Sequence, residues 1–298
     1  GRYAIENISD SERDRLVKDY ALQAALGGSA GTPLPRARLG MYRPWSPSMD
    51  EGWTRWLYEQ YGFAFTNLRD ADVRAGDLRS RYDVIVLPSE QASGLMNGFA
   101  NGSVPGQYVG GLGTEGVRSL AGFVREGGTL VCMSSSADLC IDELNLPVEN
   151  VVRGLGRGVF FSAGSLLEVR TDASHPLMAG MPERAKIFFD RSPVFTTKEG
   201  FEGAVLAAYE ADGSPLLSGY LLGEDHLQGQ AAAVDVKHGN GHVVLLGFRP
   251  QWRGQPSGTF RTLFNASLFH SEVARSAVGA DGFWTRPADA DEEEEEGN

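Results

Sequence analysis

The candidate strands 82–87 and 129–133 contain apolar residues at successive positions rather than at alternate ones. This pattern is typical of parallel strands that helices cover on both faces. Two further candidate strands, 38–42 and 63–68, precede them along the chain. The sequence therefore predicts an α/β fold with a doubly wound, mostly parallel sheet.

Helical periodicity fills the intervals between these strands. A helix is expected after Ser48, because Glu51 follows three residues later as in a capping box and apolar side chains recur along one face of 49–61. Before the strand at 129–133, apolar residues recur at i, i+3, i+4 and i+7, and the glycine pair 127–128 supplies a helix end. Strands that alternate with helices in this way favour crossover connections on both faces of the sheet.

The second half of the chain is richer in β-structure. Its strand candidates are separated by loops that contain glycine and proline, so the order of the strands within 155–230 is left open. Residues 230–248 form two apolar runs around the turn 239–241, which predicts a C-terminal antiparallel hairpin that closes the sheet. An amphipathic helix is expected over 260–268. The strand candidates are 160–161, 166–169, 186–189 and 205–209.

Shifts in composition divide the chain into three parts. Residues 1–35 hold a short helix and a linker, residues 36–275 hold the predicted α/β domain, and residues 276–298 form an acidic tail that is expected to be disordered. The formal net charge of −12 argues against nucleic acid as a main partner. No apolar run approaches the ~18 residues of a membrane-spanning helix, and residues 1–20 lack the pattern of a secretion signal.

Polar and aromatic residues follow the predicted strands, at the carboxyl ends where open parallel sheets bind their ligands. Tryptophan and arginine at such an edge offer stacking surfaces and bidentate contacts for carboxylates. The alternative is that the same residues cover the end of the sheet and pair with one another. The candidate ligand-binding residues are Arg43, Trp45, Asp50, Glu51, Glu90, Arg249, Gln251, Trp252 and Arg253.

Three consecutive serines follow the strand expected at 129–133, where a sharp turn can present a nucleophile. A serine nucleophile also needs a positioned base, for which the sequence offers Glu90 or Asp138 as a partner. No residue is assigned a catalytic role with this pattern alone. The candidates for such a role are Ser134, Ser135, Ser136 and Glu90.

No metal or cofactor site is expected in this chain. The five histidines are scattered, and none stands in an HxxE or HExxH pattern. The glycines at 111–116 fit GxGxxG, but the preceding buried strand and the acidic partner of a dinucleotide site are missing. Cys132 lies within a predicted strand, which favours a buried and inert thiol, and a bridge to Cys140 requires a fold that brings the two together.

Several segments of the sequence resemble one known family. They are RPWSPSMDEGWTRWLYEQYGF (43–63), RYDVIVLPSE (81–90), QYVGGLG (107–113), GGTLVCMSSSADLCIDELNLPVENV (127–151), SHPLMAGMPE (174–183) and GHVVLLGFRPQWRGQPSGTFRTLFNA (241–266). Together they are similar to the C-terminal region of bacterial zinc carboxypeptidase-like proteins of the carboxypeptidase A type. In that family a zinc peptidase domain precedes a domain similar to class I glutamine amidotransferases. The resemblance therefore implies a flavodoxin-like, amidotransferase-like sheet, to which the strand candidates of the second half add a β-rich insertion.

The same resemblance sets expectations about activity. It implies that zinc belongs to a preceding peptidase domain outside this chain, because no HxxE pair is present here. A working class I amidotransferase needs a cysteine at the turn after the strand at 129–133 and a late histidine, whereas this sequence has serines at 134–136 and no histidine within 249–253. We therefore expect a non-catalytic accessory domain of such a peptidase-family protein, acting in substrate binding, domain docking or assembly.

Two alternatives to the accessory domain stay open. One is a serine-dependent hydrolase or transferase that uses the turn at 134–136, and the other is a purely structural interaction or oligomerisation module. The partners that the resemblance implies are the N-terminal peptidase domain of the same protein, a peptide ligand and further copies of the chain. The expected setting is extracellular or periplasmic, because proteins of this family are usually exported.

Overall fold

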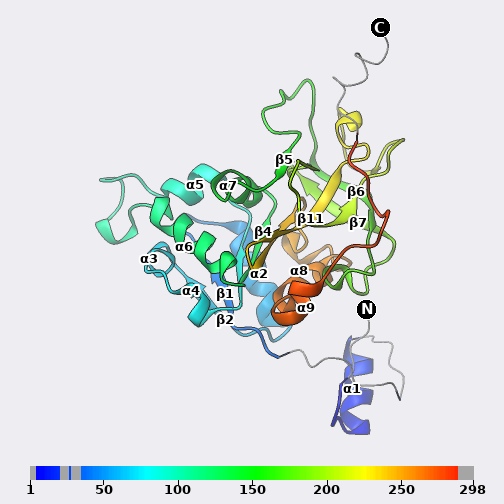
Figure 1. Cartoon of the computed structure of the whole chain (residues 1–298), viewed down its shortest axis with the longest axis horizontal. Helices are drawn as coiled ribbons and strands as arrows, with labels where there is room; N and C mark the ends of the chain where they lie inside the picture. Colours follow the sequence, from blue (N-terminus) through cyan, green and yellow to red (C-terminus); the bar gives the residue numbers. More distant parts are fainter. Residues whose placement is uncertain (1–4, 21–26, 28–34, 288–298) are drawn as a thin grey trace.

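The computed structural model describes residues 5–20, 27 and 35–287, which contain a twelve-stranded sheet with helices on both faces (Figure 1). The α-helices are α1 (Asp10–Tyr20), α2 (Met49–Gln60), α3 (Asp70–Arg74), α4 (Leu78–Arg81), α5 (Ala92–Asn97), α6 (Gly113–Arg125), α7 (Ser136–Glu143), α8 (Phe260–Leu268) and α9 (Ser271–Ser276). The strands are β1 (Leu39–Tyr42), β2 (Phe65–Leu68), β3 (Val84–Leu87), β4 (Thr129–Met133), β5 (Val148–Asn150), β6 (Ala163–Thr171), β7 (Arg184–Asp190), β8 (Phe195–Thr197), β9 (Gly203–Ala208), β10 (Leu216–Ser218), β11 (Ala231–His238) and β12 (Gly241–Leu246). Short 3-10 helices lie at Gly106–Tyr108, Pro176–Met178, Glu224–His226 and Trp252–Gly254.

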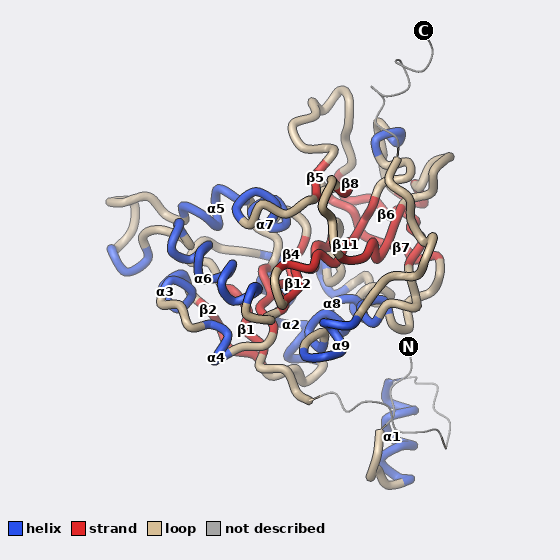
Figure 2. Tube along the Cα trace, in the orientation of Figure 1, coloured by secondary structure: helices blue, strands red, loops and turns tan. Residues whose placement is uncertain are grey.

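The sheet, whose strands are red in Figure 2, has a half with parallel pairs and a half with antiparallel pairs. Its strand order is β10-β6-β9-β11-β12-β4-β3-β1-β2, with β7 paired to β6 and β8 paired to β11 and β5. The five strands β12, β4, β3, β1 and β2 run parallel to one another, and the remaining pairs, β11 with β12 included, are antiparallel. This arrangement confirms the predicted doubly wound, mostly parallel core with a β-rich insertion.

The predicted hairpin is present but lies in the middle of the sheet. β11 and β12 pair along their length from Ala233 opposite Leu246 to His238 opposite Gly241. The expectation that the hairpin closes the sheet was wrong, because β12 lies between β11 and β4 and runs parallel to β4. Every residue of β12 is buried, as a central strand requires and an exposed edge strand does not. The hairpin therefore joins the two halves of the sheet.

The parallel strands are buried on both faces, which accounts for their successive apolar residues. Val86 and Val131 belong to the core that α2 and α8 complete on one face. Ile85 and Cys132, one position away in the same strands, belong to the core that α6 and α7 complete on the other face. Side chains of a strand alternate between the two faces, so a strand covered on both has no polar face to show in its sequence.

The chain reverses its winding direction between β1 and β3. It leaves β1 for β2 on one side and returns to β3 on the other, so the carboxyl ends of β1 and β3 form the switch point at which open α/β sheets commonly bind ligands. α2 starts at this edge after Ser48, whose hydroxyl accepts a hydrogen bond from the Glu51 N–H at 3.2 Å. The predicted capping box is only half formed, because the Glu51 carboxylate pairs with Arg55 instead.

The ends of the described chain differ in how they meet the sheet. α1 lies apart from it in Figure 1. Residues 276–287, from the predicted acidic tail, run against the antiparallel half: the Trp284 Nε1–H donates to the Gly229 carbonyl at 2.7 Å, and the Ala280 N–H donates to Asp172 at 2.6 Å. Residues 1–4, 21–26, 28–34 and 288–298 lie outside the described residues, so the linker and the disorder of the acidic end stay predictions. None of the helices described here is both long and apolar enough to cross a membrane.

Candidate functional site

The turn from β4 into α7 has the backbone geometry of a nucleophile elbow. Ser134 occupies it with a φ of 48°, a left-handed conformation that is uncommon for residues other than glycine. Its hydroxyl is fully buried and lies 3.1 Å from the hydroxyl of Ser192, which follows β7. The Ser136 hydroxyl donates to the carbonyl of Leu87 at 3.0 Å and thereby ties the turn to β3. Ser134 therefore lies in a sharp turn between a strand and a helix, with its hydroxyl turned into the protein.

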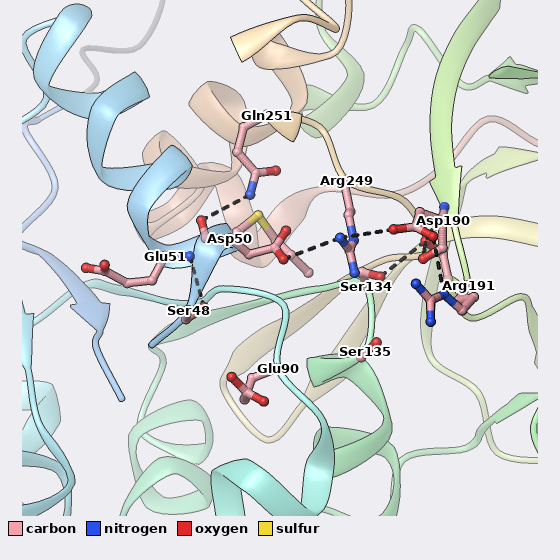
Figure 3. Close-up of polar contacts among 12 residues, drawn as sticks. Ser48, Asp50, Glu51, Glu90, Ser134, Ser135, Asp190, Arg191, Arg249 and Gln251 are labelled. Atoms are coloured by element: carbon pink, nitrogen blue, oxygen red, sulfur yellow. Dashed lines mark hydrogen bonds and ion pairs between the residues drawn. The ribbon is translucent and has the colours of Figure 1, made fainter. Parts of the chain in front are cut away.

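Arg249 is the centre of a buried charge cluster at the same edge of the sheet (Figure 3). Its Nη1 lies 3.5 Å from Asp50 Oδ2 and 3.3 Å from Asp190 Oδ2. Asp50 comes from the first turn of α2, Asp190 ends β7, and Arg249 follows β12. The fold thus unites two predicted residues, Asp50 and Arg249, with Asp190, which no sequence pattern had singled out.

Asp50 is the most perturbed acid of this cluster. Burial raises the pKa of Asp50 to about 6; Arg249 pulls it down, while Asp190 and Glu90 push it further up. The Oδ1 atom of Asp50 and the Nε atom of Arg249 have no hydrogen-bond partner among the described residues. Perturbed carboxyls and unpaired buried polar atoms concentrate at binding and catalytic sites, which supports a functional role for this edge.

The acids expected to assist the serines face other groups. Asp138 lies 2.7 Å from the guanidinium of Arg153, and the Glu90 carboxylate accepts a hydrogen bond from the Gln91 N–H at 3.2 Å. Gln91 in turn donates from its side chain to the Ser135 hydroxyl at 3.3 Å. Within the described ranges, no hydrogen bond joins either carboxylate to the serines at 134–136.

Two histidines of the described chain, His175 and His242, lie beside Asp235 rather than at the elbow. His242 pairs with Thr129 at the amino end of β4, and its Nδ1 lies 2.9 Å from Asp235. His175 lies beside the same aspartate, with 3.8 Å between its Nε2 and Asp235 Oδ2. No histidine ring is hydrogen-bonded to Ser134 in the part of the chain that the structure describes. An imidazole base therefore does not accompany the elbow.

The predicted ligand-binding residues after β12 make contacts within the domain. The buried Gln251 donates from Nε2 to the Thr54 hydroxyl of α2 at 3.0 Å. Trp252 stacks on Phe188 of β7 with 5.5 Å between ring centroids, and the Arg253 guanidinium lies 5.3 Å from the Trp252 ring. These contacts correspond to the alternative in which residues at the strand ends cover the sheet and pair with one another.

A cavity of about 570 Å³ opens at the same edge, between the β1–α2 loop and the end of β2. Three predicted residues line it: Arg43, Trp45 and Glu51. Arg69 also lines it, and its guanidinium carbon lies 3.7 Å from the centroid of the Trp45 ring. The signal that would have identified Arg69 was available in the sequence, because this residue directly follows the strand candidate 63–68.

The two cysteines lie on either side of the elbow. Cys132 of β4 and Cys140 of α7 are free and buried, with 2.6 Å between their Sγ atoms. Burial and the neighbouring thiol raise the pKa of Cys132. The described residues contain no group of three or more histidine, cysteine, aspartate or glutamate side chains able to hold a metal ion.

Comparisons with known proteins inform the fold. No protein-family description matches the sequence, and no curated protein matches it. Among solved structures, a chain in the structure of PurLQS from Thermotoga maritima is similar, with a TM-score of 0.50 and 13% identity over 78% of this chain and 98% of that one. Weaker likenesses are a putative GMP synthase protein from Thermoplasma acidophilum (TM-score 0.47, 10% identity, 78% and 92% covered) and a putative ThuA-like protein from Bacteroides uniformis (0.43, 12%, 82% and 94%).

These likenesses lie far below the identity at which activity can be transferred between proteins, and they bear on the fold alone. Nothing in them links the chain to zinc carboxypeptidases, so that part of the sequence resemblance stays a prediction. The order of the parallel strands, the elbow after β4 and the PurLQS likeness agree with one another. The chain has the class I glutamine amidotransferase-like fold.

Proposed function

We propose that the chain is a non-catalytic domain of the amidotransferase-like fold whose carboxyl edge binds a ligand without transforming it. The observation that carries this proposal is the environment of the elbow hydroxyl: Ser134 is fully buried and bonds to Ser192 at 3.1 Å. A serine nucleophile requires a base within hydrogen-bond reach. Arg249, which lies at this edge, cannot serve as that base, because a guanidinium does not lose its proton in proteins.

Activity measurements test this proposal. The purified protein is expected to hydrolyse neither glutamine nor activated esters. The variant Ser134→Cys is expected to be equally inactive, because a stronger nucleophile still lacks a base. Ser103→Cys, at an exposed serine, is the matched control for the reactivity of an added thiol. Glutamine hydrolysis that depends on residue 134 in either protein would contradict the proposal.

A serine-dependent hydrolase or transferase is the second candidate, and the left-handed elbow at Ser134 favours it. In that case Asp50, with a pKa of about 6, would be the acid able to exchange a proton near neutral pH. A fluorophosphonate probe separates the two candidates. Labelling that Ser134→Ala abolishes supports the hydrolase, whereas an unlabelled protein that retains ligand affinity supports the binding domain.

We also propose the wider setting that the sequence resemblance implies: an accessory domain of an exported zinc peptidase-family protein, docked on a preceding peptidase domain. Determining the length of the intact gene product tests this setting, because an upstream zinc-binding domain is expected in the same polypeptide.

The remaining alternative, an oligomerisation module, is tested by size-exclusion chromatography with light scattering. A monomer at every concentration would contradict self-association.

A further inference from the structure

The cavity at the β1–α2 loop is large enough to hold a small molecule. Its volume of about 570 Å³ falls within the roughly 300–1,000 Å³ of small-molecule sites. It lies at the carboxyl ends of β1 and β2, and its lining does not include the charge cluster of Asp50 and Arg249. Its charged lining residues are Arg43, Glu51 and Arg69.

One wall of the cavity is fixed by backbone contacts. Arg69 Nη1 donates to the carbonyl of Arg43 at 3.0 Å and to the carbonyl of Pro44 at 2.7 Å. The Arg69 guanidinium lies close enough to the Trp45 ring, at 3.7 Å, for a cation–π contact, and Trp45 in turn meets the ring of Tyr108 edge-on with 4.7 Å between centroids. A guanidinium held in this way needs little ordering when a ligand arrives.

The charges of the lining residues do not balance. The carboxylate of Glu51 is already paired with Arg55, which lies one helical turn further along α2. Arg43 approaches that carboxylate only to 3.9 Å, and its side chain is 44% exposed. Arg69 has no carboxylate partner within salt-bridge distance among the described residues, and burial together with the like charge of Arg43 lowers the pKa of Arg69.

We propose that this cavity binds an oxyanion, a carboxylate or a phosphate carried by a peptide or a small molecule, between Arg43 and Arg69. Both guanidiniums have the planar donor geometry that suits carboxylates and phosphates. The N-terminus of the twelve-residue helix α2 lies at the same cavity, because its N-cap Ser48 and its first residue Met49 line it, and it places the positive end of the helix dipole there. The inference rests on the proposed binding function and gives its ligand a chemical class.

Isothermal titration of the intact chain tests the inference with three probes: inorganic phosphate, a short peptide with a free C-terminal carboxylate, and the same peptide as a C-terminal amide. Binding of phosphate or of the free-acid peptide is expected, without binding of the amide. Arg43→Ala is expected to weaken it by about tenfold to a hundredfold, because a charge-assisted hydrogen bond is lost. Arg118→Ala, at an exposed arginine of α6, is the matched control and is expected to change nothing.

Each outcome of the titration decides a separate point. If only phosphate binds, the ligand of the cavity is a phosphorylated molecule. If only the free-acid peptide binds, the ligand is the carboxyl terminus of a peptide. Oxyanion binding that Arg43→Ala leaves intact, or no binding by any probe at millimolar concentration, overturns the inference. Neither result touches the claim that the elbow is inactive, which glutamine hydrolysis or fluorophosphonate labelling would overturn by itself.

A second inference rests on the cysteine pair and is independent of any ligand. Cys132 and Cys140 are buried with their sulfurs in contact, on two elements joined by the elbow. The geometry points to a disulfide that clamps β4 to α7 across the serines at 134–136. The two thiols would lose two protons and two electrons, and a small-molecule disulfide such as oxidised glutathione would accept the electrons and leave as two thiols.

Refolding from denaturant tests this disulfide, because the thiols are accessible in the unfolded chain. After refolding with oxidised glutathione, denaturation and alkylation, the expected product carries no alkyl group and has lost the mass of two hydrogen atoms. Its thermal unfolding is expected at a higher temperature than that of the protein refolded with a reducing agent. The variant Cys140→Ser, which cannot form the bond, is the control. Alkylation of both thiols in the oxidised sample would overturn the inference.

Discussion

Each end of the parallel strands holds a cluster of ionisable side chains, but only the cluster at the carboxyl ends lies beside the elbow serine. At the carboxyl ends, Asp50 and Asp190 share Arg249 at the edge that holds the elbow serine. Towards the amino end of β12, His242 and Asp235 form an imidazole–carboxylate pair, with 2.9 Å between Nδ1 and either oxygen. The five residues of β4, at about 3.3 Å each, keep the two places roughly 15 Å apart.

The separation between the His–Asp pair and the elbow serine shows that residue types alone do not locate a catalytic site. His175, Asp235 and His242 form a His–Asp cluster that has the chemistry of a general base. All three are nevertheless buried, and both histidine rings pack against Phe269. Proton transfer requires a reacting group within hydrogen-bond reach, and in the described part of the chain neither histidine is hydrogen-bonded to the elbow serine, so these side chains contribute to stability.

The largest expected effect comes from breaking the His–Asp cluster. Asp235→Ala removes a buried carboxylate and leaves the His242 ring without its partner, which should lower the free energy of unfolding by about 3–5 kcal/mol. Denaturant unfolding measures this loss. Asp212→Ala, at an exposed loop position, is the control and should stay within about 0.5 kcal/mol of the parent protein. If Asp235→Ala lowers the free energy of unfolding by less than about 1 kcal/mol, the cluster does not have the structural role described here.

At the carboxyl edge, removal of an aspartate charge should raise the free energy of unfolding instead of lowering it. Because the folded pKa of Asp50 is raised from 3.8 to about 6, the stability that this group contributes is present below pH 3.8 and is lost as the pH rises through 6. Asp50→Asn should therefore raise the free energy of unfolding at pH 7.5 by about 1–3 kcal/mol and change little at pH 4. Unfolding curves at both pH values, with Asp212→Asn as the control, check this. Destabilisation at pH 7.5 would mean that the pair with Arg249 is structural.

The sequence predicted the elements whose pattern is local. β3 and β4 were found because burial on both faces makes their residues apolar at successive positions, with Thr129 as the one exception, and the hairpin of β11 and β12 was found from its turn. The candidates 166–169, 186–189 and 205–209 fall on β6, β7 and β9. The candidate at 160–161 is not a strand and forms only a single bridge from Phe161 to Leu222. The three-residue strands β5, β8 and β10 are too short to show a period.

The site was harder to predict than the fold, because its contacts join distant parts of the chain. The position rule for strand ends selected Asp50 and Arg249, which the structure does bring together. Asp190 was missed because it ends a strand of the insertion whose order could not be derived from the sequence. Whether a side chain at a strand end faces a ligand or a neighbour depends on packing, and Gln251 illustrates the second outcome.

The pH dependence of the His–Asp cluster gives a smaller effect. Burial lowers the pKa of His175 below 6.5, against the attraction of Asp235 and Asp172. Between that lowered pKa and 6.5 the unfolded chain binds the proton and the folded chain does not, so stability falls as the pH falls through this window, by at most about 1.4 kcal/mol per pH unit. The difference in stability between the parent and His175→Gln, followed from pH 7 to pH 5, isolates this contribution from that of Asp50. A difference that does not change with pH would show that the ring titrates normally.

The smallest expected effect concerns the elbow itself and separates its conformation from its hydroxyl. Ser134→Ala removes the bond to Ser192 and keeps the left-handed backbone, which should cost about 1 kcal/mol. Ser134→Gly removes the same hydrogen bond but also removes the backbone strain at φ 48°. The free energy gained from this relief should be similar to that lost with the bond, so the free energy of unfolding should stay nearly unchanged. Denaturant unfolding of the two variants gives the difference directly. Equal stabilities would show that the elbow holds no strain, and the turn would then owe its shape to packing between β4 and α7 rather than to a position kept for a nucleophile.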